Sequence, residues 1–166
     1  MIVDYNNNIS ENIKMNFDYI IIGGGSSGCV TANKLVNNNA NVLLIEEGGS
    51  DWNPLLRIPA GFIPMLDGSP YHRFHKSIPQ KQLNNRQHDI AQAKVLGGGS
   101  SINGMVYMRG RASDYEKWKS STNGGSWGWE DILENYIHLE ANQRLNNKYH
   151  GIDGPLKVSD ANYVVK

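Results

Sequence analysis

Cysteine is almost absent from this sequence, which has a single one, Cys29, among 166 residues. One thiol cannot form a disulfide within the chain, and this composition is typical of a reducing compartment. No apolar run approaches the roughly 20 residues that cross a bilayer. The first residues also lack a basic segment followed by an apolar one, which a secretory signal requires. We therefore expect no signal peptide, no membrane partner and a cytoplasmic location.

An excess of charge of either sign is absent as well. Sixteen Lys and Arg residues balance sixteen Asp and Glu residues, and no long run of one sign occurs. Binding to nucleic acid or to an anionic membrane surface depends on a concentrated basic patch. We therefore expect no nucleic-acid partner, and we assign no metal ligand.

The length of the chain suits one domain with one core. Residues 1–16 are polar and rich in asparagine and have no hydrophobic period, so we expect a loose N-terminal arm. Order is expected to begin near Phe17. The sequence therefore predicts two parts, the arm over residues 1–16 and one domain over residues 17–166.

Residues 17–47 have the pattern of a βαβ unit. "FDYIII", residues 17–22, is a short apolar run bounded by glycines, as expected of a buried strand. "SSGCVTANKLV", from Ser26, favours a helix, and "NVLLIEE", residues 41–47, favours a second buried strand. This order predicts an α/β fold with a partial Rossmann-like domain.

The loop between the first strand and the helix has the spacing G-x-G-x-x-G, filled by Gly23, Gly25 and Gly28. In a dinucleotide site the first glycine permits a tight turn, the second lets the backbone approach a pyrophosphate, and the third allows close helix packing. Glu46 ends the second strand, where a carboxylate meets ribose hydroxyls and disfavours a 2′-phosphate. The pattern favours NAD or FAD over NADP. The alternative is a plain strand-to-helix turn with Glu46 in solvent.

Less regular sequence follows. Residues 48–92 contain five prolines and no period, so we expect a long, mostly irregular excursion. A helix is expected to begin around residues 100–103, and a short strand is expected in "PLKV". The clearest helix lies in "SWGWEDILENYIHLEA", which places five apolar residues on one face: Trp129, Ile132, Leu133, Tyr136 and Leu139.

The five letters "GGGSS" occur twice, in "YIIIGGGSSGCV" and in "KVLGGGSSINGMV". An internal repeat would also match in its flanks, and these flanks differ. A flexible linker is excluded because apolar residues surround the second copy on both sides. Two separate loops that contact one extended ligand remain as the interpretation.

The second copy lies in "AKVLGGGSSINGMVYMRGRASDYEKW", which resembles the first signature of the glucose–methanol–choline (GMC) oxidoreductases. "GGGSSGCV", "LLIEEGG", "NPLLRIPAGF", "WGWEDIL" and "HGIDGPL" resemble the N-terminal part of the same family, in the same order. The resemblance runs from about residue 17 to residue 159. It implies a flavoprotein fold that binds FAD and acts on CH–OH groups of alcohols.

The resemblance also implies which residues bind FAD. The ADP half would lie on the first loop and the flavin end on the second. The expected cofactor-binding residues are Gly23, Gly25, Ser26, Ser27, Gly28, Glu46, Gly98, Ser100, Asn103, Gly104 and Val106.

Members of this family are several times longer and carry their catalytic histidine near the C-terminus. None of the five histidines here occupies that position, so we assign no catalytic residue. We expect a truncated GMC-type oxidoreductase without activity, a remnant of the FAD-binding half. Two alternatives stay open: one half of a split enzyme whose second half is a separate chain, and a non-catalytic FAD or nucleotide-binding module.

Overall fold

The computed structural model describes residues 16–58, 61, 63 and 68–160. Almost all of the expected N-terminal arm lies outside these residues. The chain divides into two compact units, Met1–Met105 and Val106–Lys166, and we describe each by itself. The expectation of one domain over residues 17–166 stays a prediction.

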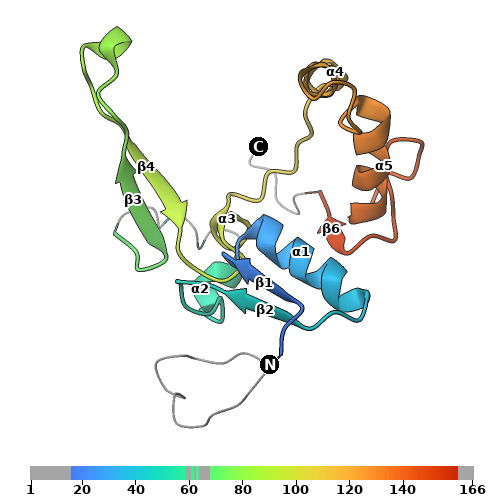
Figure 1. Cartoon of the computed structure of the whole chain (residues 1–166), viewed down its shortest axis with the longest axis horizontal. Coiled ribbons are helices and arrows are strands. Elements are labelled where there is room, and N and C mark those ends of the chain that lie inside the picture. Colours follow the sequence, from blue (N-terminus) through green and yellow to red (C-terminus); the bar gives the residue numbers. More distant parts are fainter. Residues whose placement is uncertain (1–15, 59–60, 62, 64–67, 161–166) are drawn as a thin grey trace. The chain divides into compact units, whose positions relative to one another are not determined.

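The first unit begins with the predicted βαβ arrangement (Figure 1). Strand β1 is Tyr19–Ile22, helix α1 is Ser26–Asn37 and strand β2 is Val42–Ile45. The two strands are parallel, with Tyr19 opposite Val42 and Ile22 opposite Ile45. The α/β fold class is therefore confirmed; β1 begins two residues later than predicted, and β2 begins one residue later and ends two residues earlier.

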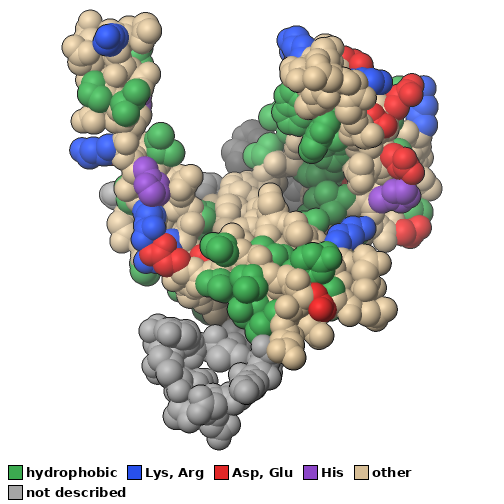
Figure 2. Space-filling view, in the orientation of Figure 1, with side chains coloured by type: hydrophobic (Ala, Val, Ile, Leu, Met, Phe, Trp, Pro, Cys, Tyr) green, Lys and Arg blue, Asp and Glu red, His purple; other side chains and the backbone are tan. Residues whose placement is uncertain are grey.

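Helix α1 covers one face of this small sheet. Ile21 faces the helix, because its Cγ2 is 3.4 Å from the position that a Cβ on Gly28 would take. Successive side chains of a strand alternate between faces, so Ile20 and Ile22 face away, and they are 61% and 86% exposed. Figure 2 shows hydrophobic side chains gathered on the surface over these strands. Among the residues that the structure describes, none covers this apolar face of the sheet.

The excursion after β2 is more regular than the sequence predicts. It contains helix α2 at Pro54–Arg57, strand β3 at His72–Lys76, the 3₁₀ helix η2 at Lys81–Leu83, and strand β4 at Asp89–Ala93. Strands β3 and β4 form an antiparallel hairpin. Neither strand was predicted, because both are largely exposed and polar, so no apolar alternation marks them. Their pairing with each other defines them.

The second unit contains helix α4 at Ala112–Ser121, helix α5 at Trp129–Leu139, and the short parallel strands β5 at Glu140–Asn142 and β6 at Leu156–Val158. Helix α5 and the strand in "PLKV" match the prediction. Helix α4 and strand β5 were not predicted. Helix α4 has one buried residue, Tyr115, so it carries no apolar stripe that a sequence pattern could detect.

Candidate functional site

The first glycine loop connects β1 to α1 with three distinct backbone requirements. Gly23 has φ +101°, a conformation that favours glycine. Gly25 is the N-cap of α1, and a Cβ built on it would meet no atom within 4 Å. A Cβ on Gly28 would overlap the carbonyl oxygen of Gly23. The loop is therefore tightly turned at Gly23, closely packed at Gly28 and open to approach at Gly25.

The start of α1 forms no capping hydrogen bond with a side chain of the described residues. The first turn of the helix contains no acidic residue. Ser26 and Ser27 are exposed. The first N–H groups of a helix have no intrahelical partner and carry a partial positive charge, so they attract anions such as phosphates. An open glycine beside an uncapped helix start fits the diphosphate of a dinucleotide.

The second glycine loop leads into helix α3, Gly99–Ile102, and it lies against the first loop. Gly97 N donates a hydrogen bond of 2.7 Å to Gly24 O. A Cβ on Gly98 would be 2.6 Å from Gly25 Cα, and the φ of Gly98 is +57°. Only glycine allows such an approach of two backbones. The two GGGSS segments, far apart in the sequence, are neighbours in space.

Glu46 lies beside the first loop, at the end of β2. Its Oε2 accepts a hydrogen bond of 2.7 Å from Gly24 N, and its Oε1 accepts one of 2.8 Å from Gly48 N. The carboxylate is partly buried against the loop backbone and is not free in solvent. Each carboxylate oxygen can accept a second hydrogen bond, so these contacts leave capacity for a ribose hydroxyl.

The other predicted residues follow along the second loop. Ser100 Oγ donates to Gly97 O at 2.6 Å. Asn103 ends α3, and its Oδ1 accepts a hydrogen bond of 2.8 Å from Met105 N across Gly104. The side chains of Ser100 and Asn103 are therefore engaged with their own backbone. Val106 belongs to the second unit and is 80% exposed.

A charge cluster that the sequence analysis missed links β2 to the hairpin. Glu47 forms ion pairs with Arg73 on β3 and with Lys94 after β4, the latter at 3.0 Å. The hydrogen bond from Lys94 and the charge of Arg73 hold the pKa of Glu47 below its ordinary value. All three side chains are at least one-third exposed, so the cluster orients the hairpin more than it stabilises the unit.

The second unit contains a buried ion cluster around Glu140, which is 0% exposed. Arg109 forms an ion pair with Glu140 Oε2. Asn142 Nδ2 and His150 Nδ1 lie 2.6 Å and 2.9 Å from Glu140 Oε1. Burial alone would raise the pKa of Glu140, but the hydrogen bonds from Asn142 and His150 and the charge of Arg109 hold it below its ordinary value. His150 thus has a structural partner.

Aromatic rings surround this cluster. The guanidinium of Arg109 lies 4.8 Å from the ring centre of Tyr136. The hydroxyl groups of Tyr115 and Tyr136 are 2.9 Å apart, and Gly110 N donates to the Tyr115 hydroxyl at 3.1 Å. The hydrogen bond from Tyr115, with burial, raises the pKa of Tyr136 to about 12. The core of the second unit therefore consists largely of tyrosine side chains whose hydroxyl groups form hydrogen bonds.

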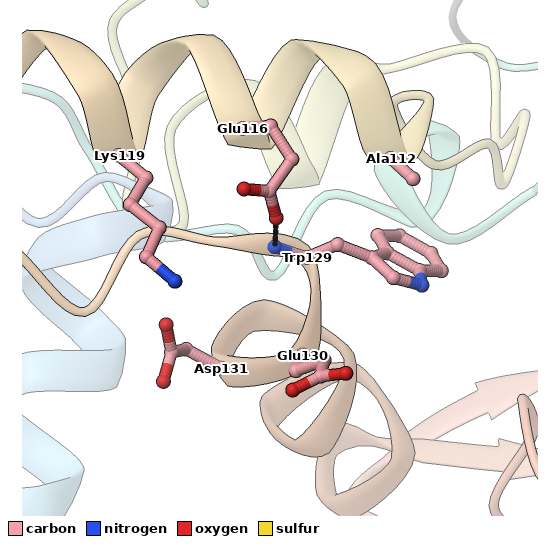
Figure 3. Close-up of a pocket in the computed structure, with 6 residues that line it drawn as sticks. All are labelled: Ala112, Glu116, Lys119, Trp129, Glu130 and Asp131. Carbon is pink, nitrogen blue, oxygen red and sulfur yellow. Dashed lines mark hydrogen bonds between the residues drawn. The ribbon is translucent and has the colours of Figure 1, made fainter. Parts of the chain in front are cut away.

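A hollow of about 490 Å³ lies between α4 and α5 (Figure 3). Three carboxylates line it, which suggests acid–base chemistry at first sight. However, Glu116 Oε1 accepts a hydrogen bond of 2.9 Å from Trp129 N, and Asp131 Oδ2 accepts one of 3.2 Å from Gly128 N. Both carboxylates therefore cap the start of α5. The hollow has a structural role and is not our candidate site.

Residues 16–58, 61, 63 and 68–160 contain no group of three or more His, Cys, Asp and Glu side chains that could hold a metal ion. No helix among them is both long and apolar enough to cross a membrane. The two adjoining glycine loops are the strongest candidate.

Comparison with known families decides the assignment. The family model described as GMC oxidoreductase matches residues 17–165. The chain belongs to the GMC oxidoreductases. The resemblance noted in the sequence is thereby confirmed, and the α/β fold is that of the N-terminal FAD-binding domain of this GMC family.

Several proteins are similar to this GMC chain. The alcohol dehydrogenase [acceptor] of Pseudomonas putida is 42% identical over 146 residues, and the alcohol oxidase of Candida boidinii is 46% identical over 154 residues. The alignments cover 87% and 89% of this chain. Among solved structures, pyridoxine 4-oxidase from Mesorbium loti has a TM-score of 0.78 and 34% identity over 86% of this chain.

The shared region is a fraction of each relative. This chain spans 26% of the P. putida protein, 22% of the C. boidinii protein and 28% of pyridoxine 4-oxidase. The likeness therefore concerns the N-terminal part of those proteins. The other roughly three-quarters of each relative lie outside the alignment with this chain.

Proposed function

We propose that this chain is the FAD-binding part of a GMC-type alcohol oxidoreductase, and that its first glycine loop holds the ADP half of FAD. The main support is the open backbone at Gly25 beside the uncapped start of α1, with the Glu46 carboxylate next to it. In this arrangement Ser26, Ser27 and the backbone of Gly28 contact the diphosphate, and Glu46 accepts from the adenosine ribose.

We propose that the second loop approaches the flavin end. Its support is the direct contact between the loops, in which Gly97 N donates to Gly24 O. An extended dinucleotide that begins on the first loop can therefore continue over the second without crossing open solvent. The residues proposed for this end are Gly98, Ser100, Asn103, Gly104 and Val106.

Bound FAD would supply the acceptor of a hydride from an alcohol carbon, and a base must take the alcohol proton. We assign that base to no residue of this chain. His150 is paired with Glu140, and His138 is exposed on α5. We therefore propose that the chain alone does not oxidise alcohols, and that oxidation needs a further polypeptide. The open apolar face at Ile20 and Ile22 favours such a partner.

Gly25→Val tests the FAD site. A Cβ at Gly25 meets no atom of the described residues within 4 Å, so we expect the variant to fold, while the valine Cβ and its two methyl groups occupy the space proposed for the diphosphate. Overpacking of this kind costs up to about 3 kcal/mol, equivalent to about a 100-fold weaker affinity for FAD. Titration of the purified protein with FAD, followed by flavin fluorescence, measures the change.

His138→Ala is the control, since His138 lies on α5 in the other unit and should leave FAD affinity unchanged. Equal affinities for Gly25→Val and the unaltered protein would refute the loop assignment. Alcohol-dependent reduction of flavin by this chain alone would refute the proposal that it is inactive. Reduction only after addition of the C-terminal part of a GMC relative would support the split enzyme, and flavin binding without reduction in either case would support the binding module.

A further inference from the structure

Gly24 joins three segments of the first unit through its backbone N–H and C=O groups. Its N–H donates to Glu46 Oε2 at 2.7 Å, and its carbonyl oxygen accepts from Gly97 N at 2.7 Å. The thiol of Cys29 donates to the same carbonyl, with Sγ at 3.2 Å. Hydrogen bonds therefore connect the Glu46 carboxylate, through the backbone of Gly24 in the first loop, to the backbone of the second loop.

A second connection starts from the other oxygen of the same carboxylate. Glu46 Oε1 accepts from Gly48 N at 2.8 Å, and the next residue, Gly49, accepts from Leu96 N at 2.9 Å. Gly49 and Val95 also form a parallel bridge. The second glycine loop is thus attached at two points, and both attachments lead back to Glu46.

The packing at this junction leaves little room for independent movement. A Cβ on Gly24 would lie 2.9 Å from Leu96 Cδ1 and 3.1 Å from Glu46 Cβ. A Cβ on Gly48 would overlap the backbone of Lys94. Gly24 is buried and Val95 is 0% exposed. These close contacts therefore prevent one loop from moving without the other.

We propose that Glu46 is a positioning residue that couples the two glycine loops, so that a ligand bound at the first loop also restrains the second. The coupling follows from the hydrogen bonds of this chain and is separate from any contact of Glu46 with ribose. Its ligand-dependent part rests on the proposed nucleotide site. A coupling free energy is reciprocal, so order in the second loop also strengthens binding at the first.

Glu46→Gln tests the coupling in the ligand-free chain. The amide keeps one accepting oxygen but presents an NH₂ group to one of the two backbone N–H donors, so one attachment is lost. Loss of a charge-assisted hydrogen bond at a partly buried site should raise the equilibrium constant for local opening about tenfold. Amide hydrogen exchange at Gly97 and Leu96, followed by NMR, should accelerate by that factor, while exchange in α4 of the second unit should not change.

Asp18→Asn is the matched control. Asp18 Oδ2 accepts from Asn41 N at 2.8 Å, so it bridges the same two strands at their opposite end. Unchanged exchange at Gly97 in Glu46→Gln, or equal acceleration in Asp18→Asn, would overturn the proposal. If the Gln variant does not fold, Glu46→Asp serves instead, because its shorter carboxylate cannot reach both donors. Exchange at Gly97 as slow as in the unaltered chain would then overturn the proposal.

ADP provides the ligand test, because it lacks the flavin and cannot occupy the proposed flavin end. At saturation, determined separately for each variant by calorimetry, ADP should slow Gly97 exchange several-fold in the unaltered chain and have little effect on it in Glu46→Gln. ADP binding without slower exchange at Gly97 would refute the coupling and leave the proposed function intact. Absence of ADP binding would refute the nucleotide site, and the ligand-free comparison would then decide the role of Glu46.

Discussion

Replacing Arg109 by Met should strongly destabilise the second unit. The side chains of Arg109 and Glu140 are 11% and 0% exposed, so the substitution leaves a carboxylate buried without its main counter-charge. Removing one partner of a buried ion pair costs about 3–5 kcal/mol. Because Asn142 and His150 still contact Glu140, we expect the lower end, about 3 kcal/mol. Methionine retains most of the apolar volume, so the loss reports charge and hydrogen bonding.

Urea unfolding followed by tryptophan fluorescence measures this effect, since three of the four tryptophans lie in the second unit. With a slope of about 1 kcal/mol per molar urea for so small a unit, the midpoint should fall by about 3 M, or the unit should unfold in buffer alone. Adding Glu140→Gln should restore at least half of the loss, because it removes the unpaired charge. As a control, Lys117→Met breaks the exposed Lys117–Asp114 pair at 3.8 Å and should change stability by less than about 0.5 kcal/mol. Equal effects of Arg109→Met and Lys117→Met would refute the reasoning.

Two predictions concern pH. The fold holds the pKa of Glu140 below its ordinary value, so the stability that the ionised carboxylate contributes is fully present above about pH 4.5 and is lost as pH falls through the folded pKa. When the pH is lowered from about 6 to about 3, the urea midpoint of the unaltered chain should therefore fall more steeply than that of Glu140→Gln. The fold raises the pKa of Tyr136 from 10.0 to about 12, so its contribution is present below pH 10 and is lost as pH rises toward 12. Ultraviolet titration of tyrosinate should therefore show one late-titrating group that Tyr136→Phe removes, and its persistence in that variant would contradict the assignment.

Local sequence was sufficient where neighbouring residues dictate the structure. The strand, glycine loop, helix and second strand over residues 17–47 follow from a short apolar run, three glycines and a carboxylate. The hairpin of β3 and β4 could not be predicted in the same way, because its strands are polar and exposed and are defined by pairing across η2. Helix α4 was missed for a similar reason, since it buries only Tyr115 and has no apolar stripe.

The candidate site was also predictable from the sequence only where local residues define it. Sequence predicted both glycine loops and the place of Glu46 at the end of a strand. It also predicted that one extended ligand could explain both copies of "GGGSS". It contained no sign that Gly97 donates to Gly24, or that Glu46 holds Gly24 and Gly48 together, because these partners are separated along the chain and no periodic pattern connects them.

By itself, therefore, the sequence determined the local backbone chemistry of this protein: where the chain turns, where glycine is needed, and hence the family to which it belongs. Only the tertiary structure decided which of these segments touch. It joined two loops through one carboxylate, and it buried Glu140 against Arg109, 31 residues away. The physical reason is that hydrogen bonds and charge pairs act over a few ångströms in space, and folding alone brings distant residues within that range.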